Sequence, residues 1–187
     1  MATIITHALV AVAVVGALGP RRPRTGLFVA GMALAMAPDL DVLGFPLGIE
    51  YSAPWGHRGL THSLLFALLI GSLSALVLCR SPTGAGPPAN PRGQCAHLAL
   101  ILSVCMASHG LLDMLTNGGL GVALFAPFDP GRMFFAVNPL QVSPIGFHGW
   151  SLERTWAIAR SELLWVGLPA LAVAVTIRLM RRRVFGR

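Results

Sequence analysis

Five apolar runs, separated by stretches rich in Gly, Pro and Arg, dominate this sequence of 187 residues. They cover about residues 3–19, 25–45, 61–79, 95–116 and 160–180. A helix needs roughly 20 apolar residues to cross about 30 Å of hydrocarbon, and each run reaches or approaches that length. Only 11% of the residues are charged, against about a quarter in soluble domains. The sequence therefore predicts an all-α, polytopic membrane helix bundle of about five spans.

The length favours a single membrane-embedded domain over residues 1–187. The first run has no basic residues before it, so we predict a retained span rather than a signal peptide. Residues 117–159 are too interrupted by Gly and Pro for a regular span, and we predict a loop-rich, partly embedded cap there. Gly59 lets the chain turn before Thr61, which we predict to be the N-cap of the third span.

The cysteines indicate little chemistry. Cys79, Cys95 and Cys105 lie in or beside apolar runs and form no CxxC pair, which argues against a thiolate zinc site. We therefore interpret all three as small, buried, apolar residues that pack between helices.

The basic residues predict the orientation of the spans. The formal charge of +7 comes entirely from Arg, because the chain has no Lys. An excess of Arg marks the cytoplasmic side of a membrane. If five spans alternate, ten of the fourteen Arg fall on one side: Arg21, Arg22, Arg24, Arg80, Arg92, Arg178, Arg181, Arg182, Arg183 and Arg187. We predict a cytoplasmic C-terminus and an extracytoplasmic N-terminus, and membrane topology explains this charge better than nucleic acid binding does.

The acids and histidines gather on the opposite side. All seven acids fall there, as do five of the six histidines. His97 alone lies toward the Arg side, and we interpret it as a hydrogen-bonding partner within the membrane rather than a metal ligand. We interpret His148 in the same way, and we expect Asp129 and Glu153 to be solvated loop acids, with a supporting role for Glu153 left open.

Four short motifs at the outer helix ends supply seven candidate metal ligands. His109 and Asp113 are four residues apart, so they share one face of a helix about one turn apart. Asp39 and Asp41 are two residues apart, so at a frayed helix end both can reach one centre. Ionisable groups within spans are expensive and are functional by default. The seven candidates are His7, Asp39, Asp41, His57, His62, His109 and Asp113.

Imidazoles mixed with carboxylates predict a divalent metal, Zn²⁺ first, with Mn²⁺ or Fe²⁺ as alternatives. Seven ligands exceed the four that one tetrahedral ion needs, so two ions are a reasonable expectation. A guanidinium beside a metal suits a phosphate group, and we predict that role for Arg58. Arg132 is a second candidate for that role, but it lies in a turn, where solvation at the surface is equally compatible with the sequence. Asp41 or Asp113, where not committed to metal, is the predicted general base.

The motifs together resemble the YdjM family of bacterial inner-membrane proteins, which are regarded as metal-dependent hydrolases. The resemblance rests on His7, PDLD at 38–41, HRGLTHS at 57–63 and HGLLDMLT at 109–116, with Gly118, Gly119 and Pro127-Phe128 also fitting. It covers about residues 5–132 and does not secure the region after Arg132. The resemblance implies an inner-membrane location and the same seven residues as metal ligands. The family's distant similarity to zinc-dependent phospholipase C and S1/P1-type nucleases implies phosphoester hydrolysis.

Our functional hypothesis is a metal-activated water that attacks a phosphoester at the outer membrane–water interface. The expected partners are membrane lipid and a phospholipid or another phosphoester substrate, and no nucleic acid is expected. Two alternatives stay open. A metal transporter would hold its site nearer the bilayer midplane, with polar groups along a pathway. A non-catalytic metal-binding sensor or scaffold would bind metal tightly and turn over nothing.

Overall fold

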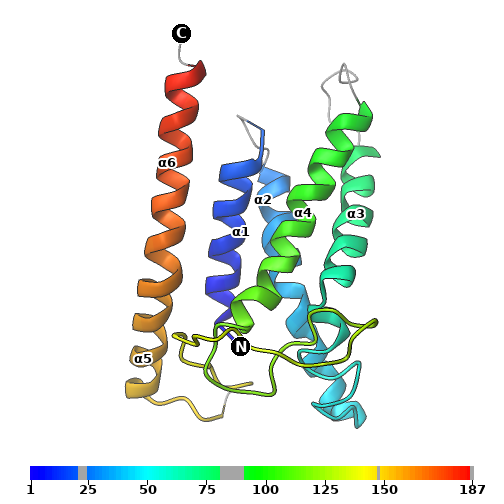
Figure 1. The fold of residues 1–187 in the computed structure, drawn as a ribbon, viewed down its shortest axis with the longest axis vertical. Coiled ribbons are helices and arrows are strands. Elements are labelled where there is room, and N and C mark those ends of the chain that lie inside the picture. Colours follow the sequence, from blue (N-terminus) through cyan, green and yellow to red (C-terminus); the bar gives the residue numbers. More distant parts are fainter. Residues whose placement is uncertain (21–24, 81–90, 147, 186–187) are drawn as a thin grey trace.

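A computed structural model describes residues 1–20, 25–80, 91–146 and 148–185, and these residues confirm the all-helical class. The main helices run side by side, with α6 at the edge of the bundle (Figure 1). Their bounds are α1 Ile4–Leu18, α2 Thr25–Met36, α3 Leu64–Arg80, α4 Pro91–Asp113, α5 Leu152–Glu162 and α6 Leu168–Phe185. A short π-helical segment, Leu163–Gly167, joins α5 to α6, so the last two helices form one continuous rod.

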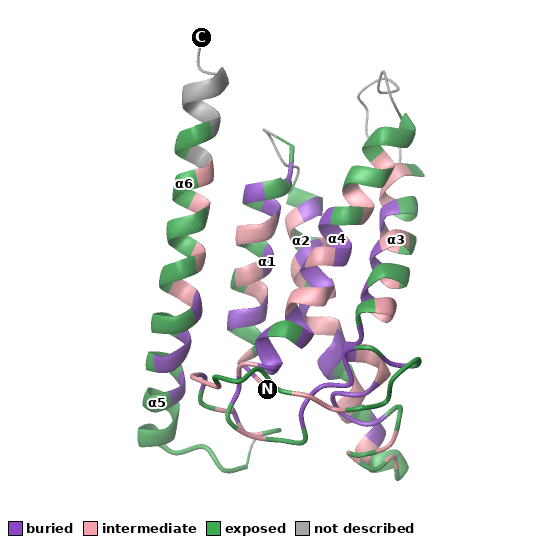
Figure 2. Cartoon of the chain, viewed as in Figure 1, coloured by how far each residue is buried: buried purple, intermediate pink, exposed green. Residues whose placement is uncertain are grey.

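Among the described residues, three helical segments are long and apolar enough to span a membrane: Thr25–Leu47, Pro91–Asp113 and Leu152–Ile177. The other two predicted spans, α1 and α3, are apolar helices of 15 and 17 residues. Figure 2 shows that buried residues lie mainly along the facing sides of α1 to α4, whereas α6 is exposed over most of its described length. This pattern suits a bundle whose outer surface meets lipid.

Two predicted spans differ from the prediction at their site ends. The second span changes at Ala37 from α-helix to a 3₁₀ helix that ends at Leu47, because Pro38 cannot donate the backbone hydrogen bond that would continue the α-helix. The third span begins at Leu64 instead of Thr61. Ser63 caps it by accepting a hydrogen bond from the Phe66 amide at 3.1 Å, so the prediction of Thr61 as N-cap is wrong.

The predicted cap is also shorter than expected. Residues 152–159 belong to α5, whose N-cap Ser151 accepts a hydrogen bond from the Arg154 amide. The polar sequence of this segment hid the helix from a search for apolar runs. In the structure the cap is the segment 114–151, in which only two isolated β-bridges, Thr116 with Leu140 and Val122 with Met133, interrupt turns and extended chain in the described part.

Small residues set the distances between the helices. A Cβ on Gly71 of α3 would lie 2.5 Å from the backbone nitrogen of Ser103 in α4, and a Cβ on Gly31 of α2 would lie 3.0 Å from Val15 of α1. Close backbone approach through small residues is the usual way in which membrane helices pack.

The interpretation of the cysteines is wrong for two of the three. The last turn of α3 lies beside the first turn of α4, so Cys79 and Cys95 face each other and form a disulfide with a Cα–Cα distance of 5.9 Å. Cys105 is buried, as expected. This disulfide and the residues Arg80 and Arg92 lie at the end of the bundle where α6 terminates (Figure 1). Of the other predicted cytoplasmic arginines, Arg21, Arg22, Arg24 and Arg187 lie outside the described residues.

Candidate metal centre

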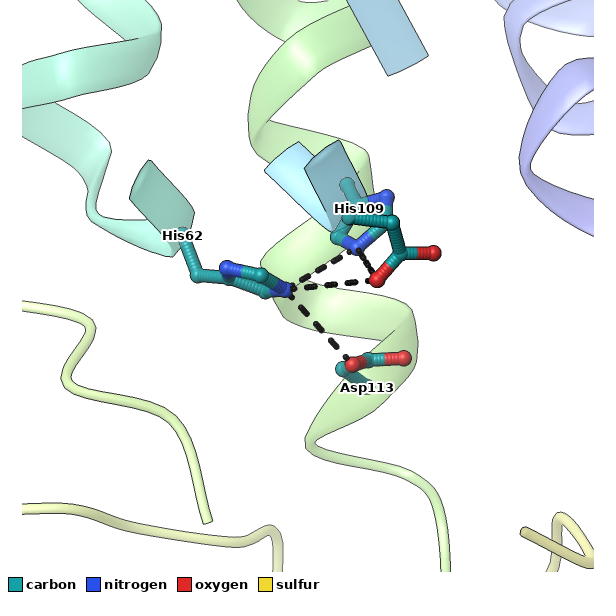
Figure 3. A group of neighbouring side chains, drawn as sticks. His62, His109 and Asp113 are labelled. Atoms are coloured by element: carbon teal, nitrogen blue, oxygen red, sulfur yellow. Dashed lines mark hydrogen bonds and ion pairs between the residues drawn. The ribbon is translucent and has the colours of Figure 1, made fainter. Parts of the chain in front are cut away.

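Four of the predicted ligands converge at the opposite end of the bundle. Figure 3 shows His62 pointing at His109 and Asp113 of α4, and the Nε2 atoms of the two histidines lie 3.1 Å apart. Asp39 Oδ1 lies 3.3 Å from the His109 Nε2 and 3.8 Å from the His62 Nε2, and the Asp113 Oδ2 lies 3.8 Å from the His62 Nε2. Ligands about 2.0–2.1 Å from a tetrahedral zinc ion lie about 3.3 Å from one another. The four atoms therefore have the spacing of a single metal site, and all lie within 4.8 Å of one another.

The hydrogen bonds behind the two histidines fix which nitrogen faces the centre. The Nδ1 of His109 lies 2.7 Å from the carbonyl oxygen of Ala35. A carbonyl only accepts, so Nδ1 carries the hydrogen and the Nε2 lone pair faces the centre. The Nδ1 of His62 lies 3.2 Å from Asp41 Oδ2 in the same manner. Metal-binding histidines characteristically donate their second ring N–H to a carbonyl or a carboxylate.

The carboxylate of Asp39 supplies the strongest evidence that a cation belongs here. It is buried, yet neither of its oxygens forms a hydrogen bond with the described residues. Burying an unpaired carboxylate costs several kcal/mol or more unless a positive charge compensates it. The donor set, two imidazoles and two carboxylates, fits Zn²⁺ and similar divalent ions.

His62 responds to the same carboxylates. Burial alone would lower the pKa of its imidazole, but side-chain contacts with Asp39 and Asp41 outweigh burial and raise the pKa above its ordinary value. The surroundings of His62 thus favour a positive charge at its ring, whether a proton or a metal ion supplies it.

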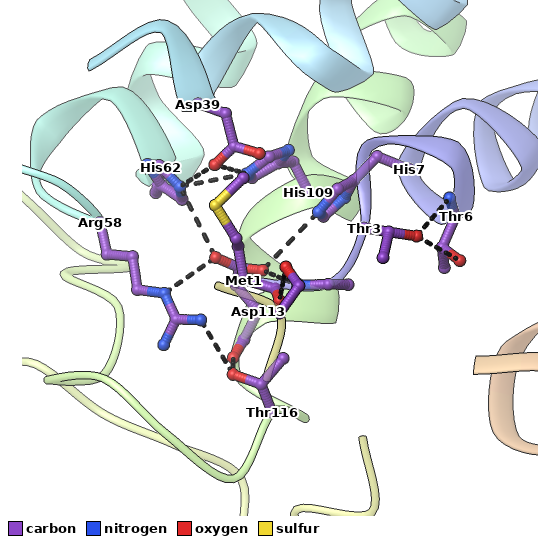
Figure 4. A network of polar contacts seen from close by, with 12 residues as sticks. Met1, Thr3, Thr6, His7, Asp39, Arg58, His62, His109, Asp113 and Thr116 are labelled. Carbon is purple, nitrogen blue, oxygen red and sulfur yellow. Dashed lines mark hydrogen bonds and ion pairs between the residues drawn. The ribbon is translucent and has the colours of Figure 1, made fainter. Parts of the chain in front are cut away.

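His7 lies beside this group, in contact with two of its members. Its ring stacks on the ring of His109 with a centroid separation of 3.8 Å, and its Nε2 lies 3.6 Å from Asp113 Oδ1. Neither ring nitrogen forms a hydrogen bond with the described part of the chain. Figure 4 shows His7 approaching Asp113 from the side of α1, opposite His62.

The remaining two predicted ligands, Asp41 and His57, lie behind His62. Asp41 accepts hydrogen bonds from His57 Nδ1 at 2.7 Å, Thr61 Oγ1 at 2.8 Å and the Arg58 amide at 3.2 Å. Ligand atoms of Asp41, His57 and His62 form a second group that could hold an ion, but these hydrogen bonds already account for their closeness. His57 Nε2 is buried and has no hydrogen-bond partner among the described residues.

Arg58 is turned toward the metal group rather than toward the surface. Its side chain is fully buried, and the guanidinium donates to Asp113 Oδ2 at 2.9 Å, Thr116 Oγ1 at 2.9 Å and the Gly118 carbonyl at 2.7 Å. These partners account for the Thr and Gly residues that follow Asp113 in the motif. The contacts favour a role for Arg58 in orienting Asp113 over its predicted role in holding phosphate.

Two residues with positive φ, Arg58 and Gly119, allow the Arg58 side chain to adopt this inward position. Arg58 has a φ of 63°, a left-handed conformation that costs a non-glycine residue about 1–3 kcal/mol. Gly119 has a φ of 94°, and a Cβ there would lie 2.7 Å from the Arg58 Nη1. Strain of this kind persists where the surroundings fix the conformation, which is common at functional sites.

Arg132 fastens the cap to the loop that carries the motif. Its guanidinium donates to the backbone carbonyls of His57 at 2.9 Å and Tyr51 at 3.0 Å. It also lies 5.8 Å from the centre of the Tyr51 ring. Arg132 is half-buried and bound to these carbonyls, so the structure shows neither of the two expectations, a phosphate-holding role or a solvated surface position.

Sequence reasoning missed a pair of hydrogen bonds that hold the first turn of α1 to the end of α5. Glu162, at the end of α5, accepts hydrogen bonds from the Thr3 hydroxyl at 2.6 Å and the Thr6 hydroxyl at 2.8 Å. The amide of Ala2, which precedes Thr3, donates a hydrogen bond to Asp113 Oδ1 at 2.9 Å. The only signal in the sequence was the occurrence of an acid at the start of an apolar run, which is costly in a membrane.

The acids and histidines that we did not interpret as metal ligands lie away from the centre. His97 hydrogen bonds to the Leu18 carbonyl at 2.9 Å, which confirms its interpretation. Asp129, His148 and Glu153 are exposed. Asp129 accepts a hydrogen bond from the Gly131 amide in its own turn.

The fold and site define an all-helical membrane protein with a buried His/Asp cluster that could hold metal. The chain belongs to the YdjM inner membrane protein family, whose pattern it matches over residues 1–185. It is 36% identical over 171 residues to the inner membrane protein YbcI of Escherichia coli (strain K12), a match that covers 91% of this chain and 94% of that protein. No solved structure matches the chain. The predicted inner-membrane location is thereby confirmed, and the match extends well beyond Arg132.

Proposed function

We propose that this protein is a membrane-bound, metal-dependent hydrolase that cleaves a phosphoester at the extracytoplasmic face of the inner membrane. The observation that carries the proposal is the convergence of four ligand atoms from Asp39, His62, His109 and Asp113 on one buried point. Three separate segments contribute these residues, and neighbouring polar groups orient His62, His109 and Asp113. Such a set is expensive to bury and is difficult to explain without a cation.

The chain would hold one divalent ion, Zn²⁺ first, through those four residues. Bound metal would supply Lewis acidity and lower the pKa of a coordinated water. Asp113 is held by Arg58 on one oxygen and by the Ala2 amide on the other, so it can shift between metal and protein donors without becoming unpaired.

We assign the proton-accepting role to His57. Its Nδ1 is hydrogen bonded to Asp41, which leaves the buried Nε2 without a partner among the described residues. A carboxylate that orients an imidazole in this way is the usual support of a general base. Asp41 and Asp113 are less suited to that role, because protein donors already occupy their oxygens.

The family resemblance and a small cavity beside the site support the proposed substrate class. About 200 Å³ of space lies next to the residues that hold Arg58, lined by Thr116, Asn117, Gly118, Gly119, Phe134 and Asn138. Clefts for drug-sized ligands measure about 300–1,000 Å³, so this one would take only a small polar group. A phosphate-containing lipid headgroup meets that limit.

The test combines metal analysis with a hydrolysis assay on purified protein in lipid nanodiscs. The protein is stripped with chelator, reloaded with Zn²⁺, Mn²⁺ or Fe²⁺, and given a chromogenic phosphodiester or phospholipid vesicles. We expect His62→Ala to lose metal and activity together. His57→Gln should keep its metal but lose about 100-fold or more in turnover, and His148→Gln, at an exposed position, should behave as wild type. Metal binding without turnover for any metal or substrate would contradict the proposal, as would full activity in His57→Gln.

One observation favours a second candidate, a non-catalytic metal site that fixes the helix ends. Structural zinc sites are closed by four protein ligands, whereas catalytic ones keep a position open, and Asp39, His62, His109 and Asp113 are all buried. In that case metal would stabilise the fold and His57→Gln would change nothing. A transporter is less favoured, because the candidate ligands Asp39, His62, His109 and Asp113 all lie at one end of the bundle, on the two 3₁₀ helices and the last turns of α4.

A further inference from the structure

The surface of the site end is unusually rich in exposed aromatic side chains. All four tryptophans of the chain lie there, and each is between 43% and 70% exposed: Trp55, Trp150, Trp156 and Trp165. The cap adds Phe128, which is 84% exposed, together with Phe125, Phe134 and Phe135. Trp is enriched where membrane proteins cross the headgroup level, because its ring is apolar and its N–H is polar.

The lengths of the helices place this surface within the membrane. At 1.5 Å per residue, the 15 residues of α1 span about 22 Å and the 17 residues of α3 about 25 Å. The hydrocarbon core is about 30 Å thick. Both helices begin at the site end, directly above the cap and its neighbouring loops (Figure 1). A shortfall of about 5–8 Å therefore remains for the cap layer to fill.

The exposed apolar surface is continuous with the lipid-facing surface of the spans. On one flank, Leu163 and Leu168 of the last helical rod lead down to Trp156 and to Leu152, which is 89% exposed. On the other flank, the 3₁₀ helix that continues α2 exposes Leu40, Leu43 and Leu47. Among the described residues, the exposed apolar surface of the spans is thus continuous with the exposed apolar surface of the site end.

Helix α5 is the site-end continuation of the span that includes α6. It exposes Arg154 and Arg160 as well as Trp156 and Leu152. The ends of spans at the headgroup level are enriched in Trp, together with basic side chains that extend toward the interface. The basic residues can reach lipid phosphates while the aromatic ring contacts the upper part of the acyl chains.

We propose that the cap and α5 are immersed in the headgroup–acyl boundary of the leaflet at the site end, with bilayer lipid as the partner of their exposed aromatic surface. The candidate metal centre lies between the cap and the apolar part of the bundle, so it then lies deeper in the membrane than the cap, on the hydrocarbon side of the lipid phosphates. This inference concerns where the cap lies and does not depend on metal binding or on hydrolysis.

Tryptophan fluorescence in reconstituted vesicles tests the proposal. Full-length variants retain only Trp55 or Trp150, with the other tryptophans replaced by Phe, and a Trp-free variant supplies the background. Phosphatidylcholines brominated at shallow or deep acyl positions quench from the membrane, and acrylamide quenches from water. In the Trp-free background, Phe128→Trp reports on the most exposed aromatic position of the cap, and Val173→Trp in α6 is the reference for the membrane core. Helical circular dichroism excludes variants that do not fold.

Shallow bromines are expected to quench Trp150 and Phe128→Trp more than deep bromines do, and acrylamide should quench both weakly. Val173→Trp should show the opposite depth preference among the bromolipids. If bromolipids quench Val173→Trp but neither cap position, the cap stands in water or against another protein, and the proposal is overturned. Strong acrylamide quenching at both cap positions would overturn it equally.

Discussion

The apolar part of the bundle and the site end are held together by different chemistry. In the apolar part, Gly31 and Gly71 bring helix backbones into close contact, and the packing leaves little room for an added methyl group. At the site end, buried polar groups such as Arg58, Asp113 and Glu162 are joined by directed hydrogen bonds. The first region fixes how far apart the helices stand. The second fixes which atoms face the centre, so a change of one methyl group matters in one region and a change of one charge matters in the other.

The largest effect is expected from Asp113→Ala. This variant removes a candidate ligand and leaves the fully buried Arg58 without its carboxylate partner. Breaking a buried ion pair from one side costs about 3–5 kcal/mol, so we expect that loss in the free energy of unfolding together with loss of metal. Chemical unfolding in detergent micelles and metal analysis measure the two quantities.

Matched variants sharpen this result. Asp129→Ala, at an exposed acid, should stay within about 0.5 kcal/mol of wild type. Adding Arg58→Leu to Asp113→Ala should recover part of the lost stability, because the buried guanidinium that has lost its carboxylate partner is then removed. Equal stability of Asp113→Ala and wild type would mean that the site end does not depend on this pair.

The next effect concerns metal removal. An ion at a site that exists only in the folded chain stabilises the fold, by about 4 kcal/mol when its concentration is about 1,000 times the dissociation constant. Chelation should therefore lower the melting temperature of the wild type. Asp39→Asn, which removes the carboxylate without changing its size, should show no response to chelator. A wild type whose melting is unchanged after verified metal loss would remove the main argument for a metal centre.

A smaller effect is expected from Gly71→Ala in the apolar part. The added Cβ would meet the Ser103 backbone at 2.5 Å, and overpacking of this kind costs about 1–3 kcal/mol. Gly16→Ala, where no atom lies within 4 Å of the new Cβ, should be neutral or slightly stabilising. If both variants lose the same stability, close packing between α3 and α4 is not what holds the apolar part together.

The last prediction involves the smallest change in free energy. It tests which end of the bundle faces the cytoplasm. The distribution of Arg predicts that Cys79 and Cys95 lie at the cytoplasmic end, whereas the structure joins them in a disulfide, and disulfides are rare in the cytoplasm. We expect both cysteines to be protected from a membrane-impermeant reductant and maleimide until the membrane is permeabilised. A cysteine introduced as His148→Cys, at the exposed site end, should react without permeabilisation. Labelling of Cys79 or Cys95 in intact cells, with or without an impermeant reductant, would reverse the predicted orientation.

The sequence was informative wherever one residue type carried the signal. Apolar runs predicted the helices, and the segregation of His and Asp predicted that distant residues such as His7, Asp39 and His109 meet at one end. These inferences needed only the length of a span and the cost of a buried charge. The start of α5 was missed for the converse reason, since its residues are too polar to register as part of a span.

Roles within the cluster could not be predicted, because they depend on the direction of side chains. A list of seven ligands does not reveal that Asp41 faces His57 while Asp39 faces the centre. Nor does it reveal that Arg58 points inward, which required a left-handed residue and a glycine at position 119. Such contacts arise between segments far apart in the chain, and neither spacing nor composition records them.

Pro38 has a consequence for chemistry on another helix. Where α2 tightens into a 3₁₀ helix, the carbonyl of Ala35 would accept from the amide three residues on, and that residue is a proline with no N–H. The carbonyl is therefore free to bind His109 Nδ1, as observed at 2.7 Å. A residue that has no polar hydrogen of its own thus selects the tautomer of a histidine in a distant part of the chain.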